Sequence, residues 1–113
     1  MEGVEEMSIS KKYRYKIVLS APIGDKEGFL TAEISNNKIE GKLTVMNRSN
    51  YFYGKIKDDG ICEITGSIST LMRVINYRGN GSIDENNLSF LLETGCQKMI
   101  LTGKILNIGD DEI

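Results

Sequence analysis

A glycine flanked on each side, two positions away, by residues that are mostly apolar recurs through this chain about once per expected strand. Because side chains alternate along a strand, each glycine shares a face with the apolar residues around it. A glycine on an inner face weakens a strand and usually marks a bend, a bulge or a close approach. The repeat therefore predicts strands that coil tightly around a narrow interior, with space cleared for a ligand as the alternative interpretation. The copies lie at residues 39–43, 52–56, 64–68, 101–105 and, in a looser form, 79–83.

Alternation of apolar and polar residues between Gly, Asn and Asp clusters predicts strands and no helix. Short links without a crossover helix imply antiparallel neighbours, and closure of the sheet would remove two exposed edges. The predicted fold class is all-β, a single antiparallel up-and-down meander of about eight strands closed into a barrel. A two-sheet roll or sandwich is the alternative. We expect strands at residues 12–20, 27–34, 38–46, 51–57, 61–69, 72–83, 88–93 and 99–106.

The length of 113 residues suits one domain. We expect a flexible tail at 1–10, a barrel domain at 11–106 and an acidic tail at 107–113. No apolar run is long enough for a membrane span, and the acidic start lacks the apolar stretch of a secretory signal. The two cysteines form no disulfide framework of the kind that secreted proteins use. The sequence therefore predicts a cytoplasmic protein without a membrane partner.

The chain contains no histidine, which removes histidine-dependent nucleophilic catalysis and histidine-ligated metals. A net charge of −2 disfavours binding to a phosphate backbone. Cys62 alternates with Ile64 and is expected in the core, whereas Cys96 is expected exposed in a loop. The acidic clusters lack the spacing of a calcium loop. We therefore predict a protein that is not an enzyme and uses no cofactor, metal or nucleic acid.

Arg73 is the polar residue that suggests a binding site. Gly79 and Gly81 are expected on the inner face. If the same alternation extends back along the strand, every second residue before them also points inward, which gives Tyr77, Ile75, Arg73 and Leu71. An inward arginine needs an anionic partner, so Arg73 and Tyr77 are candidate ligand-binding residues for an acidic group at the barrel mouth. The alternatives are a bulge after Thr70 that turns Arg73 outward, or a place at the rim beside an acidic residue.

Two tyrosines, Tyr51 and Tyr53, share the outer face of the expected fourth strand with two lysines. Aromatic and basic residues together occur on single-stranded nucleic-acid surfaces. In a meander, however, this strand does not neighbour the basic first strand, so no continuous groove results. A solvated face or an oligomer contact that uses the tyrosines is the favoured interpretation.

Residues 12–106 resemble a group of small uncharacterised β-meander proteins from clostridia-like Gram-positive bacteria. The topology is also similar to that of calycins, the lipocalin-like barrels, although this chain has no Trp and no room for a helical pair at residues 20–27. The resemblance implies a calycin-like barrel in a bacterial protein and brings no function with it. It rests on Tyr15–Leu19, Gly28–Thr31, Gly66–Ile68, Thr70–Arg73 and Leu101–Gly103.

An eight-stranded barrel is wide enough to be filled by side chains or to hold one small ligand. The sequence therefore predicts a non-enzymatic barrel that binds a small apolar or acidic molecule. The alternative is an interaction or structural module, a homodimer or accessory subunit, with a filled interior.

Overall fold

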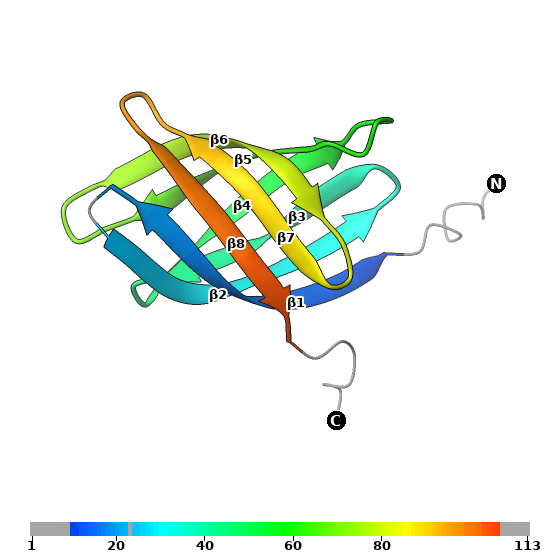
Figure 1. Cartoon of the computed structure of the whole chain (residues 1–113), viewed down its shortest axis with the longest axis horizontal. Coiled ribbons are helices and arrows are strands. Elements are labelled where there is room, and N and C mark those ends of the chain that lie inside the picture. The colour runs from blue at the N-terminus through cyan, green and yellow to red at the C-terminus, as the bar shows by residue number, and fades with distance from the viewer. Residues whose placement is uncertain (1–9, 23, 107–113) are drawn as a thin grey trace.

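Eight antiparallel strands form the structure, a computed structural model that describes residues 10–22 and 24–106 (Figure 1). Apart from residue 10, the predicted tails lie outside these residues. Each strand pairs with the next along the chain, and β8 returns to pair with β1, so the sheet is a closed barrel. The predicted fold class is thereby confirmed, and the sandwich alternative is wrong. The strands are β1 Lys11–Ala21, β2 Gly24–Ser35, β3 Lys38–Val45, β4 Arg48–Ile56, β5 Cys62–Ser69, β6 Val74–Ile83, β7 Asn87–Glu93 and β8 Lys98–Ile105.

Every second residue of each strand points into the barrel, as the alternation predicted. Of the described residues that are buried, none is charged, and the buried hydrophobic side chains form one cluster. No helix of the described residues is long and apolar enough to cross a membrane. The buried set is Tyr15, Ile17, Leu19, Leu30, Ala32, Ile39, Leu43, Val45, Phe52, Cys62, Ile64, Ile68, Tyr77, Leu88, Phe90, Leu92, Met99 and Leu101.

The inward glycines allow the strand backbones to approach closely. A Cβ atom added at Gly54 would lie 1.8 Å from the carbonyl oxygen of Glu63 on the neighbouring strand. Gly28, Gly41 and Gly81 would meet neighbouring carbonyl oxygens at 1.9–2.0 Å in the same way. These positions therefore accept no side chain without a shift of the adjacent strand, which is the close-approach role that the repeat predicted.

Side chains from neighbouring strands occupy the space above the other inward glycines. The ring of Tyr77 lies over Gly66, with its hydroxyl 2.6 Å from the position of an added Cβ. Leu92 covers Gly79 at the same distance. The space that these glycines clear is therefore filled by the protein itself.

Two hairpin turns show where the sequence prediction succeeded and where it failed. The turn at Asn36 is confirmed, with a φ of 57° at that residue. The turn predicted at residues 47–50 is wrong, because the chain turns at Met46 and Asn47 and residues 48–50 belong to β4. Both turn residues have positive φ, 56° and 62°, as a two-residue turn matching the twist of a hairpin requires.

The sixth strand begins later than predicted because the chain turns at residues 70–73. The Thr70 hydroxyl accepts hydrogen bonds from the backbone N–H groups of Met72 and Arg73 at 3.2 and 3.1 Å. The Thr70 N–H donates to the carbonyl of Arg73 at 2.8 Å. These bonds end β5 at Ser69 and start β6 at Val74, instead of at residue 72. The second strand begins earlier than predicted, since Gly24 already pairs with Ala21.

The close approach at Gly54 leads to a stability prediction. Gly54→Ala is expected to lower the free energy of unfolding by roughly 1–3 kcal/mol, because the methyl group would overlap the Glu63 carbonyl. Gly95→Ala is the matched control, since nothing lies within 4 Å of an added Cβ there. Urea unfolding followed by circular dichroism measures both, and equal stability of the two variants would contradict the role given to Gly54.

Candidate functional site

Arg73 and Tyr77 lie in different environments. Arg73 is exposed in the turn between β5 and β6, and Leu71 beside it is 87% exposed. The inward orientation given for Leu71 and Arg73 is wrong, because the turn at Thr70 interrupts the extended strand. The alternative, a departure from the strand after Thr70 that turns Arg73 outward, is what the structure has. Tyr77 points inward as predicted and is 3% exposed. Tyr77 lies four positions after Arg73, about 13 Å along an extended chain, so Arg73 is at the rim and Tyr77 is inside.

The hydroxyl groups of the two buried tyrosines differ in their partners. Tyr15 donates a hydrogen bond of 2.5 Å to the carbonyl oxygen of Asp84, in the turn between β6 and β7. The Tyr77 hydroxyl has no hydrogen-bond partner within the described part of the chain. Burial raises the pKa of both tyrosines, and for Tyr15 the nearby Tyr13 and Asp84 raise it further.

The chemical groups of the interior do not form a reactive centre. Cys62 is fully buried, and desolvation followed by the charge of Glu63 raises the pKa of its thiol to about 11. Cys96 is exposed in the turn between β7 and β8, as predicted, and neither cysteine forms a disulfide. Among the residues that the structure describes, no three Cys, Asp or Glu residues gather in a metal-binding arrangement.

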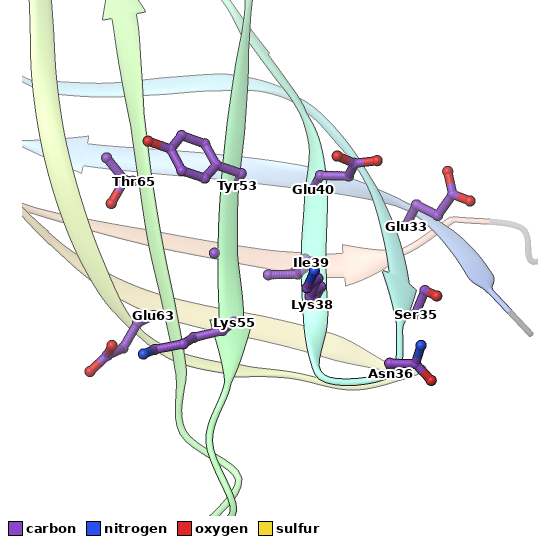
Figure 2. A pocket seen from close by; sticks show the side chains of 11 residues that line it. Glu33, Ser35, Asn36, Lys38, Ile39, Glu40, Tyr53, Lys55, Glu63 and Thr65 are labelled. Atoms are coloured by element: carbon purple, nitrogen blue, oxygen red, sulfur yellow. The ribbon is translucent and has the colours of Figure 1, made fainter. Parts of the chain in front are cut away.

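A hollow of about 820 Å³ lies on the outer surface over β2, β3, β4 and β5 (Figure 2). Apart from Ile39 and Gly54, which are inner-face residues, its strand residues point away from the barrel interior, since they alternate with core residues along each strand. Charged, hydroxyl and aromatic groups all contribute. The lining residues are Glu33, Ser35, Asn36, Lys38, Ile39, Glu40, Tyr53, Gly54, Lys55, Glu63 and Thr65.

Two residues that line the hollow, Ile39 and Gly54, are inner-face positions, so their backbone is the part that faces outward. Gly54 pairs with the buried Ile39 on one side and with Ile64 on the other. Because Gly54 carries no side chain and the carbonyl of Glu63 comes close to it, β4 and β5 are drawn together there. The outer side chains therefore surround a stretch of bare backbone.

Strand register arranges the outer side chains of the hollow into two parallel rows. Directly opposed pairs connect the members of each row from one strand to the next. The first row is Glu33, Glu40, Tyr53 and Thr65, and the second is Ser35, Lys38, Lys55 and Glu63. In Figure 2 the Tyr53 ring extends toward Thr65, and the Lys55 side chain extends toward Glu63.

The charges of the hollow are largely unpaired. Between described residues the ion pairs are Lys57–Glu63 at 3.3 Å and Lys98–Glu93 at 3.9 Å. Glu33 and Glu40 therefore have no cation within 4 Å among these residues, and Tyr53, in the same row, is 64% exposed. Such a surface can hold charged groups of a ligand against an aromatic ring.

Sequence reasoning placed Tyr53 and Lys55 on the outer face of the fourth strand, but it did not single out Glu33, Lys38, Glu40 or Glu63. The sequence did contain a signal for Glu33 and Glu40, because a two-residue turn at Asn36 and Asn37 places these two residues opposite each other. The place of Tyr53 beside Glu40 depends on the next turn, which the prediction misplaced.

Comparisons with known proteins bear on the fold. No family model matches the chain, and no curated protein does. Among solved structures the chain is similar to redesigned β-barrels. The barrels mFAP1 and mFAP0, both described as bound to DFHBI, are each 16% identical with a TM-score of 0.62 over 84% of this chain and 93% and 96% of theirs. The barrel b11L5F_LGL is 12% identical with a TM-score of 0.66, over 84% of this chain and 90% of its own.

These similarities support the predicted barrel topology of the calycin type. They do not bear on the resemblance to proteins of clostridia-like bacteria, which stays a prediction.

The two buried tyrosines lead to opposite mutational predictions. Tyr15→Phe removes the hydrogen bond to Asp84, so it is expected to lower the free energy of unfolding by about 1 kcal/mol. Tyr77→Phe removes a hydroxyl without a described partner, so stability is expected to stay constant or rise. Thermal and urea unfolding of the two variants measures the difference, and a larger loss for Tyr77→Phe would contradict the assignment.

The raised pKa values of these tyrosines also predict a pH dependence. The folded state holds both hydroxyls protonated to higher pH than the unfolded state does. Stability is therefore complete below the ordinary tyrosine pKa of about 10 and is lost as pH rises above it. Urea unfolding between pH 8 and pH 11 should show this fall, and Tyr77→Phe should reduce its slope; an unchanged slope in that variant would be the contrary result.

Proposed function

We propose that this protein is a non-enzymatic barrel that binds a small molecule in the hollow over β2–β5. The observation that carries the proposal is the hollow itself, whose volume of about 820 Å³ lies within the range typical of small-ligand sites. It combines one exposed aromatic ring with charged and hydroxyl groups that can orient a ligand.

Chemistry and fold similarity support the same proposal. The chain has no histidine, the Cys62 thiol is buried, and Cys96 does not line the hollow, so neither a histidine base nor a cysteine nucleophile is present among the described residues there. The mFAP barrels, whose structures are described with bound DFHBI, indicate that a barrel of this size tolerates a small-molecule site.

A second binding site inside the barrel is favoured by one observation, the unpaired hydroxyl of Tyr77. A buried polar group without a partner lowers stability, so a polar atom of a ligand at that hydroxyl would remove the cost. Arg73 at the rim would then meet an acidic end of the same molecule. Such a ligand must displace side chains, because Tyr77 itself covers Gly66.

The alternative function, an interaction module, draws on the filled interior and on the exposed tyrosines of β4. Tyr51 is 77% exposed and Tyr53 is 64% exposed, and both lie on the outer face. A homodimer contact through this face would occupy the hollow and exclude a ligand from it.

A ligand screen on matched tyrosine variants tests the proposed function. Saturation-transfer NMR with a library of metabolite-sized molecules is expected to give binders whose signals are lost in Tyr53→Ala and kept in Tyr51→Ala. Tyr51 is the control because it lies two residues away on the same face, is more exposed, and does not line the hollow.

The other outcomes separate the competing functions. Binders that survive Tyr53→Ala and are lost in Tyr77→Phe would move the site into the interior. The absence of any binder, together with a dimer in sedimentation velocity that Tyr51→Ala dissociates, would overturn the proposal in favour of the interaction module.

A further inference from the structure

Two pairs of like charges oppose each other directly across neighbouring strands of the hollow. Glu33 on β2 is the cross-strand partner of Glu40 on β3. Lys38 on β3 is the cross-strand partner of Lys55 on β4. Side chains in such positions have Cβ atoms about 5 Å apart, and like charges placed there destabilise a sheet. The barrel therefore keeps two local repulsions side by side on one surface.

The acidic pair is not neutralised within the described residues. Neither carboxylate lies within 4 Å of a described cation. Lys12 on β1 is the other cross-strand partner of Glu33, and it forms no ion pair there. The other neighbour of Glu40 is Tyr53, a neutral residue whose ring extends toward Thr65 in Figure 2.

The basic pair has a nearby carboxylate that is already engaged. Lys55 lies opposite Glu63 and extends toward it in Figure 2, but the closest cation to the Glu63 carboxylate is Lys57, at 3.3 Å. Lys38 is opposite Ser35 on its other side, a neutral residue. An anion between Lys38 and Lys55 would therefore meet two ammonium groups and little competing charge.

The two pairs are held at a fixed separation by the strands. Glu40 and Lys38 are two residues apart on β3, so the rows lie about 7 Å apart. A single small ion can neutralise one row only. A divalent cation is also a poor match, because the described residues contain no group of three potential ligands here.

We propose that the hollow binds a zwitterionic small molecule whose ammonium and carboxylate groups are separated by a short apolar chain, as in an ω-amino acid. This inference rests on the proposed function and specifies its ligand class. The ammonium group lies between Glu33 and Glu40, and the carboxylate lies between Lys38 and Lys55. The apolar chain crosses the outer side of the β3 backbone at Ile39, which is the cross-strand partner of Gly54.

A titration with one zwitterion and its two single-charge analogues tests the inference. The full chain, uniformly labelled with ¹⁵N, is titrated with 5-aminopentanoate, pentylamine and pentanoate at low ionic strength. Only 5-aminopentanoate is expected to shift the amide signals of Ile39, Gly54 and Lys55 in a saturable way. Because the charges are exposed, the affinity is expected to fall as salt is added.

Charge-removing variants locate the two ends of the probe. Glu40→Gln and Lys38→Gln should each weaken 5-aminopentanoate binding by roughly tenfold, the effect of losing one charge-assisted contact. Each change also removes one of two repelling charges, so the variants should melt at or above the temperature of the unaltered protein. Glu27→Gln, an exposed carboxylate of β2 outside the hollow, is the control and should bind normally.

Each contrary result has a distinct meaning. If pentylamine binds as tightly as 5-aminopentanoate, or if Lys38→Gln binds 5-aminopentanoate as tightly as the unaltered protein, the proposed zwitterion site is wrong. The hollow would then be a site for a cation. No binding of any of the three probes, while library binders are lost in Tyr53→Ala, would overturn this inference but not the proposed function. Shifts confined to the interior around Tyr77 would overturn both.

Discussion

The structure depends on the absence of a side chain where neighbouring strand backbones meet inside the barrel. At Gly54 the carbonyl oxygen of Glu63 occupies the space that a Cβ atom would need. Similar contacts at Gly28, Gly41 and Gly81 repeat this approach around the sheet. Eight strands can then coil around a narrow interior lined by one cluster of buried hydrophobic side chains. A larger residue at these positions would widen the barrel and expose that core.

Side chains occupy the space above several inward glycines, so the outer surface is the better place for a binding site. Aromatic rings cover glycines inside the wall: Tyr77 lies over Gly66, and the ring of Phe52 comes within 2.8 Å of an added Cβ at Gly41. A glycine therefore does not by itself indicate an empty pocket, because a neighbouring strand can supply the missing volume. On the outside, Gly54 lines the hollow together with outward-facing side chains of β2, β3, β4 and β5.

The fold could be predicted from the sequence to a greater extent than the site. Alternation and glycine parity are local properties, and they identified the strands and the inner face of the sheet. The orientation of Arg73 could not be obtained in this way, because it depends on whether the Thr70 hydroxyl caps a turn or the strand continues. Which residues of β2, β3 and β4 meet in the hollow depends on the strand register that the two turns between these strands set. One of these, at Asn36, was readable, whereas the other places Met46 at a positive φ that sequence propensity disfavours. An error in that turn shifts every partner of β4, so the position of Tyr53 beside Glu40 could not be predicted.

The separation of core and surface in this barrel also explains how unfavourable charge pairs can be retained. The opposed carboxylates of Glu33 and Glu40 lie on the outer face, where solvent reduces their repulsion to a small fraction of the stability that the apolar interior supplies. The residues that alternate with them along β2 and β3, among them Ile39, belong to the interior cluster and hold the strands in register. A ligand of opposite charge can therefore gain from the outer residues without any rearrangement of the core. In this architecture the outer face can change its binding chemistry while the glycines and the inner face keep the barrel closed.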